Sequence, residues 1–159
     1  MPGPKLVTLV SYGTMENPNI VTVSYAGQIT DRLMYVSLRP SRNSNQSIRG
    51  CKRFAINYIG SDLVKEADFC GIYSSRDTDK FKETGLNLDF DQEIPMIVES
   101  PLSLECVLKN ITRMGEHDVF FGEVNKAIRR NEESSWLYHD NFEYFGNGNQ
   151  LGSLFQIGK

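Results

Sequence analysis

The chain has 159 residues, of which 40% are hydrophobic and 23% charged, a composition that fits one domain over residues 1–159 with its own buried core. Its formal net charge of -3 gives no general attraction to nucleic acid or to an anionic membrane. No apolar run approaches the roughly 20 residues of a membrane span, and the first residues lack a signal-peptide pattern, so we expect a cytoplasmic protein.

The first third of the chain is predicted to form β-strands. Residues that are β-branched or aromatic are dense over 6–12, and this run stops at Gly13. Side chains alternate in character over 20–26 and again over 33–39, which predicts two further strands, the second closed by Pro40.

Short helices are predicted between the strands of the middle third, where one more strand is expected over 54–59. Residues that cap helices, and glycines that end them, mark the boundaries. The predicted helices run from Asn43 or Ser44 to Gly50, from Ser61 or Asp62 through Cys70, and from about Asp77 to Thr84 before Gly85.

The last third returns to strands. Alternation over 102–108 predicts one strand, and 119–124 is apolar on both faces except at Gly122 and Glu123. A strand buried on both faces is typical of a barrel wall that something else covers, such as a second subunit. Asn147-Gly148 predicts a type I′ turn. Many strands with a few short helices therefore predict a mainly β (α+β) fold, a β-barrel.

Several familiar catalytic sites are excluded by spacing. The three cysteines are odd in number and form no C-x-x-C pair, so we expect reduced thiols rather than disulfides or a zinc site. His117 and His139 are isolated in the sequence, which argues against a histidine metal site. The glycine-rich segment 146–152 lacks the dinucleotide-binding spacing, and no G-x-S-x-G elbow is present.

The segment 37–44 suits a phosphate monoester. Ser37 and Arg39 share one face of a predicted strand. Arg42 lies in the loop that follows, and Ser44 stands at the predicted start of a helix. Guanidinium groups, hydroxyls and the free N–H groups of a helix start are the donors that phosphate accepts from. On composition alone, a solvated turn with an ordinary helix cap explains the same pattern.

Two further segments carry suitable side chains. The stretch 74–81 offers hydroxyls and two cations, Arg76 and Lys80, for the same anion, or else forms a capped surface helix with Phe81 in the core. The small hydroxyl residues of 22–26 would let a flat ring approach the backbone, although taken alone this segment is simply a barrel strand.

Taken in order, these segments resemble the flavin reductase-like, FMN-binding split-barrel family, which includes flavoredoxins. The resemblance covers roughly residues 5–128 and rests on the order and spacing of several motifs rather than on any one of them. The matching segments are 6–10, 19–24, 37–44, 54–58, 75–81, 84–86 and 115–124.

The resemblance implies a homodimeric split β-barrel that binds FMN noncovalently near the subunit interface. Carried over position by position, the residues that line the isoalloxazine are Thr22, Ser24, Tyr25 and Ala26. Those that hold the phosphate end are Ser37, Arg39, Arg42, Asn43 and Ser44, and those that close over the phosphate or ribityl chain are Ser75, Arg76 and Lys80. His117 falls on the family's G-x-H position, where a substrate or nicotinamide approaches the flavin, and is the candidate catalytic residue.

The implied function is that of a flavin reductase or flavoredoxin-type oxidoreductase that passes electrons from NAD(P)H through FMN, with the redox chemistry supplied by the flavin. One alternative is a non-enzymatic FMN-binding electron carrier or sensor, reduced by a protein partner. A flavin-free β-barrel binding module is another, against which the acidic balance and the lack of a basic stripe interleaved with aromatic residues both weigh. We expect no nucleic acid or membrane partner.

Overall fold

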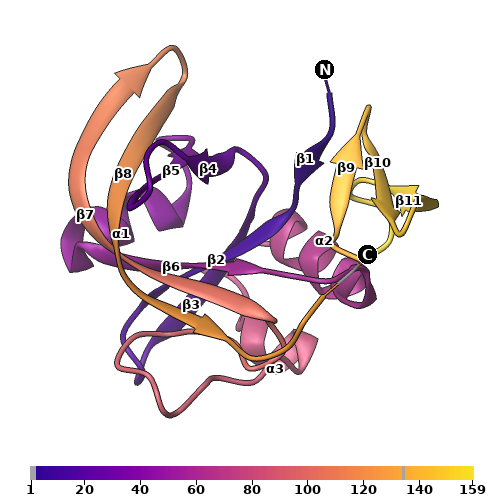
Figure 1. Cartoon of the computed structure of the whole chain (residues 1–159), viewed down its shortest axis with the longest axis horizontal. Helices are drawn as coiled ribbons and strands as arrows, with labels where there is room; N and C mark the ends of the chain where they lie inside the picture. Colours follow the sequence, from indigo (N-terminus) through magenta and orange to yellow (C-terminus); the bar gives the residue numbers. More distant parts are fainter. Residues whose placement is uncertain (1–2, 134) are drawn as a thin grey trace.

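The computed structural model describes residues 3–133 and 135–159. Its regular structure is mostly strand, arranged in one seven-stranded sheet and one four-stranded sheet, both antiparallel. Figure 1 shows the large sheet curled into a half-barrel, with the small sheet beside it. The predicted mainly β fold with a few short helices is confirmed.

The large sheet follows the order β3-β2-β6-β7-β8-β5-β4, and the small sheet the order β1-β9-β10-β11. The strands of the large sheet are β2 (Thr8–Gly13), β3 (Pro18–Val23), β4 (Ala26–Gln28), β5 (Leu33–Leu38), β6 (Arg53–Tyr58), β7 (Leu102–Met114) and β8 (His117–Arg129). Those of the small sheet are β1 (Lys5–Leu6), β9 (Tyr138–Asp140), β10 (Glu143–Gly146) and β11 (Asn149–Ser153). The helices are α1 (Asn43–Cys51), the 3₁₀ helix η1 (Ser61–Leu63), α2 (Val64–Ile72) and α3 (Lys80–Thr84).

The long hairpin of β7 and β8 curls the large sheet. Its register shifts twice, between Glu105 and Cys106 and between Leu108 and Asn110. Such bulges bend the strand that carries them and increase its twist. A sheet curled in this way encloses apolar side chains on its inner face and leaves β3 and β4 as its two edge strands.

Two strand predictions were wrong in their bounds. The run over 6–12 is two strands, because the N–H of Val7 bonds to the carbonyl of Leu137 (2.9 Å) and the chain then passes from the small sheet to the large one. The run over 20–26 ends at Val23, and a bend at Ser24 and Tyr25 precedes β4. Alternation of side chains predicts an extended chain, but it does not show which neighbouring strand pairs with each residue.

The helix predictions were right in place and partly wrong in their caps. Helix α1 runs through Gly50 and ends because Lys52 adopts the left-handed conformation (φ 60°) and donates its N–H to the carbonyl of Ile48. Its N-cap is Arg42, which makes no side-chain cap bond. Helix α3, in contrast, ends at Gly85 as predicted. The predicted type I′ turn is also confirmed, since both of its central residues have positive φ between β10 and β11.

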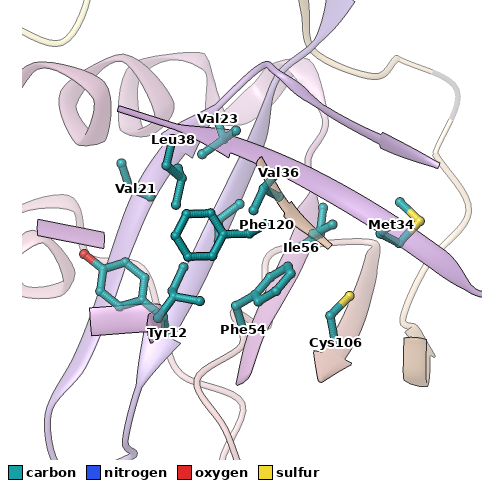
Figure 2. Close-up of a cluster of buried hydrophobic side chains, with 12 residues drawn as sticks. Tyr12, Val21, Val23, Met34, Val36, Leu38, Phe54, Ile56, Cys106 and Phe120 are labelled. Atoms are coloured by element: carbon teal, nitrogen blue, oxygen red, sulfur yellow. The ribbon is translucent and has the colours of Figure 1, made fainter. Parts of the chain in front are cut away.

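The inner face of the half-barrel is a closely packed apolar core. Figure 2 shows Phe120, Phe54 and Tyr12 pointing into the same space, beside aliphatic side chains from the neighbouring strands. All three rings are at most 1% exposed. A second apolar cluster packs α2 against β2 and the small sheet, through residues such as Ala67 and Leu137. This second cluster holds the small sheet in a defined place beside the barrel.

Gly122 in β8 is required by this packing. A β-carbon there would lie 2.6 Å from Cζ of Phe54 and 2.8 Å from Cβ of Cys106, well inside van der Waals contact. We expect Gly122→Ala to lower the free energy of unfolding by about 1–3 kcal/mol, because overpacking a dense core forces its neighbours to shift. Urea unfolding checks this.

The matched control is Gly50→Ala, at an exposed position of α1 with nothing within 4 Å of the added atom. Alanine inside a helix is favoured over glycine by about 0.5–1 kcal/mol, so this variant should be more stable than the wild type. Equal stability of Gly122→Ala and the wild type would contradict the packing argument.

Candidate functional site

A cavity of about 340 Å³ lies between the β3 and β5 strands of the half-barrel and the small sheet. Its lining combines hydroxyl, basic and aromatic side chains with aliphatic ones. Seven of the residues singled out from the sequence line it: Thr22, Ser24, Tyr25, Ser37, Arg39, Arg42 and His117. Segments far apart in the chain are therefore brought to one concave surface, as ligand sites usually require.

A narrow second pocket adjoins this cavity and shares Val21 and Arg42 with it. Asn43, Ser44 and Ser75 line it at the start of helix α1. Among the residues that the structure describes, the buried hydroxyl of Ser44 has no hydrogen-bond partner. Because a buried polar atom without a partner is costly, this hydroxyl indicates an acceptor or donor that a ligand would supply.

Three predicted residues stand apart from these two pockets or are occupied by other contacts. Ala26 pairs with Val36 in the sheet and does not line the cavity. Arg76 donates to the carbonyl of Ser41 (3.3 Å) and lines a neighbouring groove. Lys80 is 4% exposed and borders the narrow pocket, but its amine donates to two backbone carbonyls. Burial lowers the pKa of Lys80 to about 8.

His117 begins β8 at the mouth of the cavity. Its Nδ1 lies 3.1 Å from Oγ of Ser37, and its ring meets the ring of Tyr25 edge-on at 5.7 Å. The N–H of Ser37 in turn bonds to the carbonyl of Tyr25 (2.8 Å), which holds the bend after β3 against β5. The three side chains therefore form one connected group on the cavity wall.

A charged cluster beneath this group fixes α1 to the β7–β8 hairpin. The buried carboxylate of Asp118 accepts hydrogen bonds from Arg113 (2.6 Å), Arg49 (2.9 Å) and Asn45 (3.0 Å). These bonds, above all the one from Arg113, lower the pKa of Asp118. Since Asp118 follows His117 and α1 carries the pocket residues at its start, the cluster sets the distance between the two halves of the site.

The sequence did not indicate the opposite wall of the cavity. That wall comes from the C-terminal segment and consists of His139, Phe142, Tyr144, Leu154 and Phe155. It is held in place by Asp68 of α2, whose carboxylate accepts bonds from the Tyr144 hydroxyl (2.7 Å) and from the N–H groups of Phe155 (2.6 Å) and Gly158 (2.8 Å). The Asn147-Gly148 turn had indicated a hairpin here, but no sequence signal shows where a hairpin packs.

Comparison with known proteins places this chain in a family. The sequence profile of the flavin reductase like domain matches residues 3–147. The chain belongs to the flavin reductase like family. An uncharacterised protein of Aeropyrum pernix is 30% identical over an alignment of 127 residues that covers 70% of this chain and 48% of that protein. The chain thus spans about half the length of that relative. A second relative, from Archaeoglobus fulgidus, is 25% identical over 75% of this chain and 70% of its own length.

Solved structures share the fold over nearly the whole chain. Flavoredoxin of Desulfovibrio vulgaris (Miyazaki F) superposes with a TM-score of 0.82 and 25% identity, covering 100% of this chain and 95% of that one. An FMN-binding protein from Thermus thermophilus with bound p-hydroxybenzaldehyde gives a TM-score of 0.80 at 19% identity, over 92% and 90% of the two chains. Membership of this family supports the assignment of the chain as a flavin-related oxidoreductase. In the described ranges, no helix is long and apolar enough to cross a membrane.

The Asp118 cluster makes stability depend on pH. We expect Asp118→Asn to lower the free energy of unfolding at pH 7 by about 2 kcal/mol, because hydrogen bonds to charged groups contribute roughly 1.5–3 kcal/mol. The pKa of Asp118 is lower in the folded than in the unfolded chain, so its contribution is complete above about pH 4 and is lost as the pH falls through the folded value.

Melting temperatures of the wild type and Asp118→Asn, measured from pH 7 downward, should therefore converge in acid. The control is Asp31→Asn, an exposed residue of the β4–β5 turn, which should follow the wild type throughout. A constant difference between wild type and Asp118→Asn at every pH would refute this account.

Proposed function

We propose that the chain binds FMN noncovalently in this cavity and acts as a flavin reductase or flavoredoxin-type oxidoreductase that takes electrons from NAD(P)H. The observation that carries the proposal is the unpartnered Ser44 hydroxyl beside Arg42, in a narrow pocket that opens from a larger, partly apolar cavity. A phosphate monoester attached to a flat ring system has the shape and polarity of these two joined spaces.

The phosphate would occupy the narrow pocket. Arg42 supplies a guanidinium fork, Ser44 a free hydroxyl and Asn43 an amide, all at the start of a nine-residue helix. The first N–H groups of a helix have no partner within it and carry partial positive charge, which favours an anion. The amine of Lys80, also on the border of this pocket, adds a second cation close to the same place.

The isoalloxazine would occupy the larger cavity. Val7, Val23 and Leu38 provide apolar surface there, and the bend at Ser24 and Tyr25 brings backbone close to the ligand. When bound, the flavin supplies the redox chemistry. The protein's own contribution is to orient the ring, to exclude water from one face and to offer His117 at the mouth of the cavity, where a second substrate would approach.

The same proposal includes a homodimer. Val119 and Phe121 alternate along β8 with the fully buried Phe120 and remain partly exposed in the single chain. Met114, at the tip of the β7–β8 hairpin, is 62% exposed. A second copy that covered this face would bury these side chains, as the apolar pattern over 119–124 predicted.

The absorbance spectrum tests the proposed function directly. Purified protein supplied with FMN is expected to be yellow, with bands near about 450 and 370 nm from the bound flavin, and to bleach under anaerobic conditions on addition of NADH or NADPH. Bleaching by dithionite but by neither nicotinamide would favour an electron carrier or sensor reduced by a protein partner. Protein that stays colourless and does not retain added FMN would refute the flavin site.

Arg42→Ala tests the phosphate pocket. Loss of a charge-assisted hydrogen bond should weaken FMN binding by at least about 1 kcal/mol, roughly fivefold in Kd, and leave riboflavin, which lacks the phosphate, unaffected. Titration of flavin fluorescence measures both affinities. Arg129→Ala removes a similar charge outside both pockets and should leave both affinities unchanged. An unchanged FMN affinity in Arg42→Ala would move the phosphate elsewhere.

A further inference from the structure

His139 is a buried polar side chain with an unmet hydrogen-bonding need. It lies in the middle of β9, paired with Lys5 on one side and Tyr144 on the other, and is 5% exposed. Within the described part of the chain, neither of its ring nitrogens has a hydrogen-bond partner. Its ring lines the large cavity.

A buried histidine without hydrogen bonds lowers the stability of the fold unless a ligand supplies a hydrogen-bond partner. Burying a polar group without a hydrogen bond costs about 1–3 kcal/mol by mutational data. Burial, with a smaller contribution from the charge of Lys5, lowers the pKa of His139, so the ring is neutral near pH 7. A neutral imidazole has one N–H donor and one acceptor nitrogen, and can therefore meet either a carbonyl or an N–H of a ligand.

The other side chains of the same wall are apolar or already hydrogen-bonded. Phe142 and Phe155 are apolar and about half exposed, at 55% and 47%. The hydroxyl of Tyr144 already donates to Asp68. Among the C-terminal residues described as lining the cavity, His139 is thus the one whose side-chain polar atoms have no hydrogen-bond partner.

The position of His139 indicates which part of a bound flavin it would contact. His139 lines the large cavity but not the narrow pocket that Arg42 and Ser44 line at the start of α1. A ligand anchored there by its phosphate would reach His139 with its ring. Of the two ends of an isoalloxazine, the dimethylbenzene edge has no hydrogen-bonding atom, whereas the pyrimidine edge alternates carbonyls with an N–H.

We propose that His139 forms a hydrogen bond with the pyrimidine edge of the flavin ring and thereby fixes which way the ring lies in the cavity. This contact rests on the proposed flavin site and adds to it a residue of the C-terminal sheet, beyond the segments from which the site was recognised in the sequence. His139 and Arg42 would then hold the two ends of one ligand, the ring and the phosphate.

Flavin titrations of His139→Phe test the contact, since phenylalanine keeps a ring but has no nitrogen. The loss of one hydrogen bond should weaken FMN binding about three- to tenfold. Riboflavin should lose affinity by the same factor, because His139 acts on the ring that both flavins share. Arg42→Ala gives the opposite pattern, with the loss confined to FMN. Far-ultraviolet circular dichroism and the melting temperature report whether each variant is folded.

Two further variants complete the test. Tyr138→Phe changes the neighbouring residue on β9, whose ring stacks on Phe145 rather than lining the cavity, and should bind both flavins as the wild type does. His139→Gln keeps a donor and an acceptor; it should lose less affinity than His139→Phe, and it carries the test if that variant does not fold.

Wild-type affinity for FMN in folded His139→Phe would overturn the proposal. A loss seen with FMN but not with riboflavin would overturn it as well, since it would put His139 at the phosphate end. Failure of the wild type itself to bind either flavin is a separate result, obtained before any variant is made, and refutes the flavin site rather than the role of His139.

Discussion

The buried carboxylate of Asp68 is the interaction on which the form of the site depends. It is fully buried in α2 and accepts three hydrogen bonds, all from the C-terminal segment beyond β9. A buried carboxylate needs such donors, and the segment needs a fixed anchor, so each satisfies the other. Together with the apolar cluster between α2 and the small sheet, the Asp68 carboxylate holds the cavity wall that faces β3 and β5.

A second buried carboxylate, that of Asp118, anchors the part of the site that α1 and β8 form. Asp118 joins α1 to the β7–β8 hairpin through Arg49, Arg113 and Asn45. The start of α1 and the first residue of β8 are thereby held together, and with them the narrow pocket and His117. The site is thus built between two rigid supports, each centred on one carboxylate. Precise positioning of this kind is what a bound ring requires, because small displacements at its edges would break hydrogen bonds at either end.

The hydrogen-bond donors of the site are the part that the sequence alone predicts. The residues around Arg42 and Ser44 indicate an anion site through their donors alone, and the structure brings them beside a cavity. For other residues, the packing of the fold determined contacts that the sequence did not indicate. The amine of Lys80, expected to close over the phosphate or ribityl chain, also bonds to two backbone carbonyls, and α1 ends at Lys52 rather than at Gly50. In both cases the decisive partner is a backbone group whose position depends on the fold.

The sequence by itself determined the class of fold, most strand and helix positions, the type I′ turn and the family, because periodicity, turn residues and motif order are properties of short segments. It could not determine that the strand over 6–12 divides between two sheets, or that the C-terminal hairpin closes the cavity with His139. Both depend on contacts between residues far apart in the sequence, Leu6 with Tyr138 and Asp68 with Gly158, and such contacts leave no local pattern. Tertiary structure alone therefore decided which polar groups of the described residues remain buried and unpaired, and with them which groups a ligand would meet.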